Sequence, residues 1–201
     1  MAIVNNKNNS SRFGKAFKYS MLASCLASAF TSYAATANQV IWSENFDDPA
    51  IDGKGAIHTN IDMVGVTKWS IDVSGAQLTA SSDWFQVKSG KLEARDVDGD
   101  AVWLSEVIDV SAATGINISV SASESGTHEG TDYFDLAYSL DGAAFVLVTD
   151  WQGKGSASHT LVDDFTAETV TVDLNAASTL QVKVIMKNNA GSEYIRLDDV
   201  V

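Results

Sequence analysis

Apolar and polar residues alternate along most of the chain beyond residue 38, and helical spacing is nearly absent. The alternation is clearest in INISVSAS from Ile116, TVTVDL from Thr169 and LQVKVIMK from Leu180. Because successive side chains of a strand point to opposite faces, a period of two indicates half-buried antiparallel strands. By this pattern and by runs of β-branched residues we predict eleven strands, over residues 40–46, 68–73, 84–87, 91–95, 101–106, 116–123, 133–139, 145–149, 168–174, 179–187 and 194–200.

Turn-forming residues lie between these segments. The chain places Ser89-Gly90, Asp98-Gly99, Asp141-Gly142 and the stretch 189–191 where tight turns are needed, and such residues adopt positive φ at low cost. Many short strands without helices predict an all-β fold, a two-sheet antiparallel β-sandwich of the jelly-roll type. Residues 38–201 have the length of one domain and show no fixed-period repeat.

The first 37 residues follow a different pattern. Basic residues precede the apolar run YSMLASCLASAF, and the small residues TSYAATA follow it before Asn38. This order is typical of a secretory signal peptide, so we predict that residues 1–37 are removed and that the protein is secreted, with a periplasmic location as the alternative. The run is too short to span a membrane, which takes about 20 apolar residues. The sequence LASC at 22–25 resembles a lipoprotein box and leaves lipid anchoring at Cys25 as another alternative.

Removing that leader leaves a strongly acidic domain. The chain has 13 Lys and Arg against 26 Asp and Glu, a net charge of −13. The leader holds four bases and no acid, so residues 38–201 keep nine bases against 26 acids, a net charge of −17. Such a surface repels phosphate backbones, and we expect no nucleic-acid partner. With the single cysteine in the leader, the domain has neither a disulfide nor a thiolate metal site.

Four segments carry a family resemblance over essentially the whole predicted domain. In chain order they are WSENFDD, WFQVKSGKLEARDVDGDAVWLSEVIDVS, DYFDLAYSLDG and YIRLDDVV. They resemble the jelly-roll modules of secreted bacterial proteins that are related in fold to carbohydrate-binding modules and MAM-type domains. Members of such a group differ widely in their ligands, so the resemblance implies the fold and leaves the function open.

The resemblance also implies a structural calcium ion. In similar jelly rolls an acidic residue of the first strand lies beside an aspartate of the last strand. The matching residues here are Glu44 or Asp47 and Asp198. Calcium takes about six to eight oxygen ligands, and two neighbouring carboxylates repel each other without a cation. The alternative is that Asp198 and Asp199 are ordinary surface acids.

Other candidate metal and catalytic motifs are weak. The acids of Asp96-Val97-Asp98-Gly99-Asp100 resemble the start of an EF-hand loop, but Ala101 and Val107 stand where that loop needs glycine and glutamate, and a turn explains the segment better. His128-Glu129 lacks the second histidine of an HExxH motif. We expect His58, His128 and His159 to be surface residues in loops, and we expect no enzymatic activity.

Aromatic residues favour a binding role. Trp69, Trp84, Trp103 and Tyr138 fall in predicted strands, and we expect them in the core. Trp151 instead stands at the head of the connection 150–167, which also holds His159, Asp163 and Asp164. An aromatic platform beside amides, hydroxyls and acids is the mixture that a sugar site uses, so we predict ligand binding by these four residues. The alternative is that Trp151 and Phe165 pack against the sheet as hydrophobic anchors of the loop.

We therefore expect a secreted, non-catalytic recognition or adhesion module that binds a polysaccharide or another glycan and holds a structural calcium ion. A structural or adhesion domain that binds protein at the cell surface or in the matrix is one alternative. An accessory domain of a secreted hydrolase or nuclease is another. The early connection 47–67 is a second candidate rim for a ligand or for the calcium ion.

Overall fold

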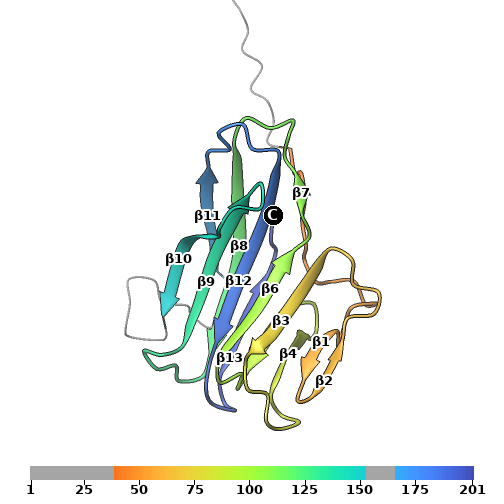
Figure 1. The fold of residues 1–201 in the computed structure, drawn as a ribbon. Helices are drawn as coiled ribbons and strands as arrows, with labels where there is room; N and C mark the ends of the chain where they lie inside the picture. Colours follow the sequence, from red (N-terminus) through yellow and green to blue (C-terminus); the bar gives the residue numbers. More distant parts are fainter. Residues whose placement is uncertain (1–38, 153–165) are drawn as a thin grey trace, which may run out of the picture. The chain divides into compact units, whose positions relative to one another are not determined.

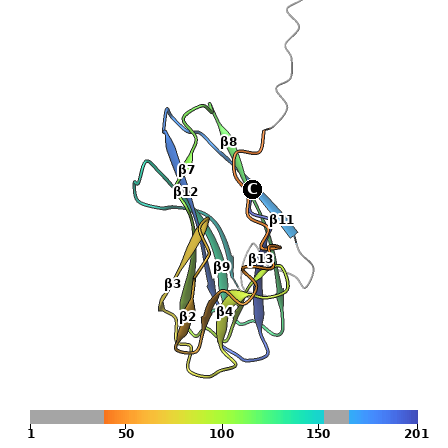
Figure 2. The same cartoon turned by 90° about the vertical axis from the view of Figure 1, so that its right-hand side faces the viewer.

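The protein is an all-β sandwich of two antiparallel sheets, as the alternation predicts (Figures 1 and 2). The computed structural model describes residues 39–152 and 166–201. The seven-stranded sheet has the order β11-β8-β13-β5-β4-β1-β2. Its strands are β1 (Gly55–Ile57), β2 (Asn60–Asp62), β4 (Trp84–Val87), β5 (Leu92–Arg95), β8 (Ile116–Ser125), β11 (Thr166–Val172) and β13 (Tyr194–Asp198).

The six-stranded sheet forms the second layer. It has the order β10-β9-β12-β6-β3, and a short strand β7 also pairs with β12. Its strands are β3 (Trp69–Gly75), β6 (Asp100–Ser105), β7 (Ile108–Asp109), β9 (Tyr133–Leu140), β10 (Val146–Gln152) and β12 (Thr179–Lys187). Within the described residues, no helix is long and apolar enough to cross a membrane.

The core lies between the two sheets. Along β12 buried and half-buried residues alternate strictly, and the same alternation in β13 buries Ile195 and Leu197. The largest aromatic contributors are Trp103, Phe46, Phe85 and Phe134, all 1% exposed or less. Phe46 packs edge-on against Trp69 and Trp103, with ring centroids 5.8 and 6.2 Å apart. The predicted core positions of Trp69 and Trp103 are therefore confirmed.

Ten of the eleven predicted strands correspond to strands of the structure, and the first one was wrong. Residues 40–46 form no strand; only Glu44 pairs, through an isolated antiparallel bridge to Val200. The early connection instead contains the β1–β2 hairpin, which the pattern missed because each strand has only three residues. Two-residue β7 was missed for the same reason.

Most of the predicted turns are present. Ser89, Gly90, Asp98, Asp141 and Gly142 all have positive φ, between 49 and 75°. Asp96 also has positive φ, so the acidic stretch after β5 is a turn into β6, as preferred over a calcium loop. The turn predicted at 189–191 is also present, between β12 and β13, and the Glu193 N–H donates to the Ala190 carbonyl there, but no residue of this stretch has the expected positive φ.

Candidate binding face and metal sites

The outer face of the seven-stranded sheet carries an aromatic and polar group of side chains. Alternation in β4, β5, β8 and β13 sends one set of residues to the core and the other set outward. The cross-strand partners are Trp84 with Arg95, Gln86 with Glu93, Glu93 with Arg196, and Tyr194 with Ser125. We call this outward set the aromatic face; it comprises Trp84, Gln86, Glu93, Arg95, Ser123, Ser125, Tyr194 and Arg196.

Trp84 and Tyr194 form the centre of the aromatic face. Their rings lie 6.3 Å apart at an angle of 48°. The Arg95 guanidinium lies over both rings, 4.7 Å from Trp84 and 5.6 Å from Tyr194. The Lys88 ammonium lies 3.6 Å from the Trp84 ring centroid. Cations at such distances are attracted to the ring faces, and this holds the basic side chains against the sheet.

Hydrogen bonds fix the polar part of the aromatic face. Glu93 accepts one bond from Trp84 Nε1 at 3.0 Å and pairs with Arg196 Nε at 2.8 Å. Arg196 also donates from Nη1 to Ser125 Oγ at 2.9 Å. Glu93 thus orients both the Trp84 indole and the Arg196 guanidinium. Polar groups held in this way keep a fixed direction on the surface.

Two buried polar atoms of the aromatic face have no hydrogen-bond partner, Arg95 Nε and Ser123 Oγ. The other end of Arg95 donates from Nη1 to the Ser82 carbonyl. A buried polar atom without a partner costs about 1–3 kcal/mol, so such atoms are rare and call for a bound water or ligand group. Within the described part of the chain, neither Arg95 nor Lys88 forms an ion pair.

The structure corrects two predictions about tryptophans. Trp84 is half-buried on the outer face and does not lie in the core, because it occupies the outward position of β4. Trp151 is not in a connection: it belongs to β10, where it pairs with Phe134 of β9. Three of the predicted ligand-binding residues, His159, Asp163 and Asp164, lie outside the described residues, as does Phe165.

The predicted calcium ligands lie where the chain before β1 meets the end of β13. Glu44 and Val200 exchange two backbone hydrogen bonds, of 2.9 and 2.8 Å. The Glu44 side chain is 7% exposed, and its Oε1 accepts from the Phe46 N–H at 2.8 Å. This pairing joins the two segments that the resemblance placed side by side. We call Glu44, Asp47 and Asp198 the acidic junction.

Asp198 is the most perturbed member of the acidic junction. Burial raises its pKa to about 6, and the negative charges of Asp199 and Asp47 add to the rise. The N–H of Asp199 and the charge of Lys91 oppose it. Asp47 lies over the turn after β4, where a Cβ on Gly90 would come within 2.5 Å of Asp47 Oδ1. Unfavourable proximity of carboxylates is the condition that a cation relieves.

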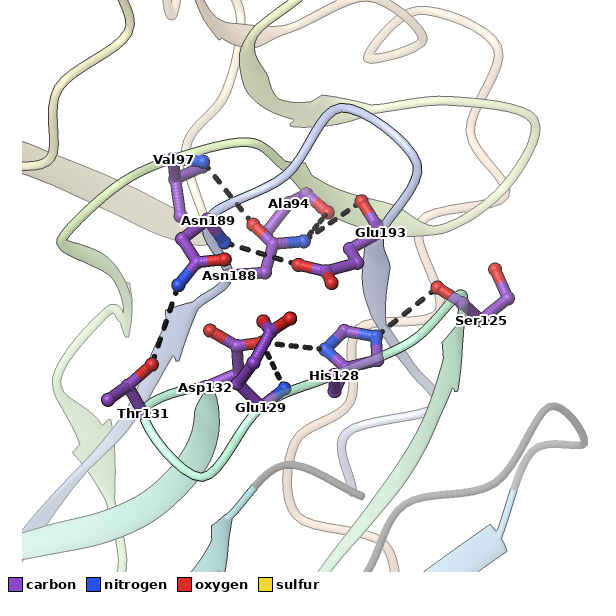
Figure 3. Close-up of polar contacts among 10 residues, drawn as sticks. All are labelled: Ala94, Val97, Ser125, His128, Glu129, Thr131, Asp132, Asn188, Asn189 and Glu193. Atoms are coloured by element: carbon purple, nitrogen blue, oxygen red, sulfur yellow. Dashed lines mark hydrogen bonds and ion pairs between the residues drawn. The ribbon is translucent and has the colours of Figure 1, made fainter.

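His128 is buried, and the prediction of a surface histidine was wrong for this residue. It is 3% exposed, and its Nδ1 lies 3.5 Å from Asp132 Oδ2. Glu193 lies beside them, and one donor atom from each of the three residues falls within 4.8 Å of the others (Figure 3). Among the described residues this histidine cluster is the group of three side chains close enough to hold a metal ion. His58 is exposed, as predicted.

The sequence held only weak signals for the aromatic face and the histidine cluster. Trp84, Arg95 and Tyr194 come from three strands, and nothing in the spacing of residues 84, 95 and 194 reveals that these strands are neighbours. The His128-x-x-x-Asp132 spacing was visible, but Glu193 is 61 residues beyond Asp132. Both groups depend on strand order, which a single sequence does not supply.

No family model matches this chain. No curated protein matches it. Similar solved structures include a cleaved adhesin domain of Lys-gingipain, with 19% identity and a TM-score of 0.43, covering 79% of this chain and 96% of that one. A CBM4 carbohydrate-binding module has 15% identity and a TM-score of 0.40, covering 67% and 92%. The module TmCBM61, in complex with β-1,4-galactotriose, has 13% identity and a TM-score of 0.41, covering 66% and 85%.

Carbohydrate-binding modules and adhesin domains are thus among the structures to which this chain is similar, as the sequence resemblance predicted. With identities of 19% or less and TM-scores below 0.5, these similarities carry no conclusion about ligand or mechanism. What this protein binds has to be argued from its own side chains.

Proposed function

We propose that this protein is an exported, non-catalytic recognition module that binds a glycan on the aromatic face and holds a structural calcium ion at the acidic junction. Export rests on the predicted leader of residues 1–37. The observation that carries glycan binding is the outward Trp84–Tyr194 ring pair, flanked by polar side chains that Glu93 holds in place.

Sugar rings need this combination of groups. Their C–H faces pack on aromatic rings, while their hydroxyls require hydrogen-bond donors and acceptors at fixed positions. Trp84 and Tyr194 supply the rings, and Glu93 and Arg196 supply polar edges held by their mutual ion pair.

The charge of the aromatic face favours a sugar that carries a carboxylate or sulfate. Lys88 and Arg95 each lie against the Trp84 ring, and neither is neutralised by an ion pair in the described part of the chain. The chain as a whole has a net charge of −13, so two basic side chains at one ring differ in charge from the chain as a whole. Arginine binds planar carboxylates and sulfates through paired N–H groups.

Calcium at the acidic junction would have a structural role. Asp47 and Asp198 supply carboxylates, and Glu44 sits on the bridge that ties the early segment to Val200. Burial raises the pKa of Asp198, and an ion there would neutralise the repulsion from Asp199 and Asp47 that adds to the rise. It would also hold two distant parts of the chain together. The predicted set of Trp151, His159, Asp163 and Asp164 remains a second location for the ligand, and the experiment below separates the two.

Affinity electrophoresis in millimolar calcium tests the proposal. The purified protein is run through gels that contain neutral or uronate-bearing polysaccharides, and retardation measures binding. We expect retardation by at least one polysaccharide, strongest for an acidic one. Trp84→Ala should weaken binding about tenfold or more, because truncating a central aromatic contact costs on the order of 1.4 kcal/mol or more.

Matched variants locate the site. Lys88→Gln should weaken binding to an acidic polysaccharide, whereas Lys183→Gln removes the same charge from a lysine 4.3 Å over the Phe145 ring and should leave binding unchanged. Retardation that survives Trp84→Ala and disappears in Trp151→Ala would move the site to β10 and the segment after it. No retardation by any polysaccharide would contradict glycan binding and favour a protein partner.

A further inference from the structure

His128, Asp132 and Glu193 lie on two connections that both cross from one sheet to the other. The residues between β8 and β9 carry His128 and Asp132, and those between β12 and β13 carry Glu193. The register places the connections side by side, because Tyr194 pairs with Ser125 and Lys187 pairs with Tyr133. Figure 3 shows His128 and Asp132 on one connection facing Glu193 on the other.

The three side chains are buried more deeply than ordinary ion pairs. His128, Asp132 and Glu193 are 3%, 0% and 2% exposed. Asp132 Oδ2 accepts from the Glu129 N–H at 2.9 Å, but Asp132 Oδ1 has no hydrogen-bond partner, and neither has His128 Nδ1. A fully buried carboxylate oxygen without a partner is costly, and it points to a group that occupies the space between these side chains.

The histidine cluster brings two buried carboxylates and one buried imidazole together. One donor atom from each of His128, Asp132 and Glu193 lies within 4.8 Å of the others. Carboxylate oxygens and an imidazole nitrogen are ligands that zinc takes from proteins.

A protonated histidine alone does not satisfy these groups. The His128 Nδ1 to Asp132 Oδ2 distance of 3.5 Å is too long for a good hydrogen bond. The other ring nitrogen, Nε2, already faces the Ser125 carbonyl at 3.2 Å. In the neutral imidazole, a carbonyl facing Nε2 places the N–H on that nitrogen and leaves Nδ1 with its lone pair, which is the arrangement seen in metal-binding histidines.

We propose that His128, Asp132 and Glu193 bind one divalent metal ion of the zinc type. The inference is independent of the proposed glycan and calcium sites. Imidazole favours zinc-type ions, whereas calcium prefers oxygen ligands alone. Tetrahedral zinc at about 2.0–2.2 Å from its ligands keeps the donor atoms roughly 3.3–3.5 Å apart. The donors here lie within 4.8 Å of one another, so a contraction of at most about 1.5 Å brings them to zinc-binding distance.

The surrounding residues already hold the two connections in place. Asn188 donates to the carbonyls of Ala94 and Glu193 and accepts from the Val97 N–H. Gly126 has φ +109°, and a Cβ there would lie 3.1 Å from Glu193 Cγ and 2.5 Å from the Ser192 carbonyl. Only glycine allows Glu193 to approach this closely. A metal ion would therefore fasten both sheet-to-sheet crossings at one end of the sandwich.

Calorimetric titration with zinc chloride tests the proposal directly. The purified full chain is stripped with EDTA, dialysed, and titrated in excess calcium chloride, so that calcium sites and the acidic surface are already saturated. We expect one zinc ion per chain. At a hundredfold excess over Kd, zinc should raise the melting temperature by about 5–10 °C, because binding to the folded state alone stabilises it.

Conservative variants distinguish the cluster from other zinc-binding groups. Asp132→Asn and His128→Gln should each weaken zinc binding at least tenfold and remove the rise in melting temperature, while both metal-free variants still melt cooperatively. His58→Gln removes an exposed histidine outside the cluster and should bind zinc as the unchanged protein does. Absence of zinc uptake by the unchanged protein, or equal uptake by the Asp132→Asn and His128→Gln variants, would overturn the proposal.

Discussion

At the scale of single residues, the raised pKa of Asp198 reflects its burial and the other carboxylates near the acidic junction. Its pKa lies near 6 because it is partly buried and because Asp199 and Asp47 are close by. A carboxyl group whose pKa is raised by folding ionises more readily in the unfolded chain. Its contribution to stability is therefore complete below about pH 4 and is lost as the pH rises through 6.

This sign gives a prediction for the metal-free protein. In calcium-free buffer, the free energy of unfolding of Asp198→Asn relative to the unchanged protein should rise between pH 4 and pH 7 by about 1–2 kcal/mol, allowing for solvent screening of a part-exposed group. Urea unfolding at pH 4, 5, 6 and 7 measures the difference. A difference independent of pH would mean that Asp198 is not perturbed in the folded state.

Calcium should reverse that dependence, because only an ionised Asp198 binds the ion well. In millimolar calcium the unchanged protein should gain stability as the pH rises through 6, and Asp198→Ala should lose most of that gain. In chelator the same substitution should cost little. Equal losses of melting temperature in calcium and in chelator would remove the calcium ion from the proposal.

The type of a residue predicted its burial less well than the alternation of apolar and polar residues along a strand did. The core positions of Trp69 and Trp103 were predicted correctly from their strands. Trp84 was not, because it occupies an outward position of β4, in which Phe85 and Val87 are both buried. With four mostly apolar residues, the alternation in that strand is too short to give its inward face. His128 was expected at the surface because loop residues usually are exposed. In the structure its side chain instead lies against the Ser125 carbonyl and close to Glu193.

At the scale of elements, β1 depends on a close approach of two backbones. Gly55 begins β1 with φ +132°, and a Cβ there would lie 2.3 Å from the Phe85 carbonyl and 2.6 Å from the Gln86 Cα. Gly53, two residues earlier, has φ +81° but no atom within 4 Å of its would-be Cβ. An alanine at Gly53 would meet backbone strain alone, whereas an alanine at Gly55 would also clash with β4.

We predict that Gly55→Ala costs more than about 2 kcal/mol of unfolding free energy, because β1 must move away from β4. Gly53→Ala should cost only about 1–2 kcal/mol, the price of placing an alanine in a left-handed conformation. Denaturant unfolding of both variants measures this. Similar costs for the two substitutions would show that β1 yields without loss of pairing.

The length and alternation of a strand decided whether the sequence predicted it. The long strands β8, β9 and β12 were located to within two residues, because each repeats its period of two several times. The three-residue strands β1 and β2 carry no readable period. The expected first strand had the right composition, but only Glu44 finds a partner, because β13 ends at Asp198 and Asp199 turns the chain at φ 44°.

At the scale of the whole domain, the sandwich places its candidate sites in separate regions. The acidic junction joins the segment before β1 to the end of β13, and the histidine cluster lies beyond the other end of β13, at the crossings into β9 and β13. The aromatic face spans the strands between them. The fold class followed from composition and periodicity, but the assembly of these groups required the strand order.

The central claim is that Trp84 and its neighbours form the ligand-binding surface. The measurement that tests it most directly is an NMR titration of the five tryptophan indole N–H signals with an oligosaccharide of the retained polysaccharide. The Trp84 signal, assigned through its loss in Trp84→Phe, should shift in proportion to ligand occupancy, because its Nε1 donates to Glu93 on the binding surface. A Trp84 signal that stays in place while the Trp151 signal shifts, or no shift in any indole signal, would contradict the account.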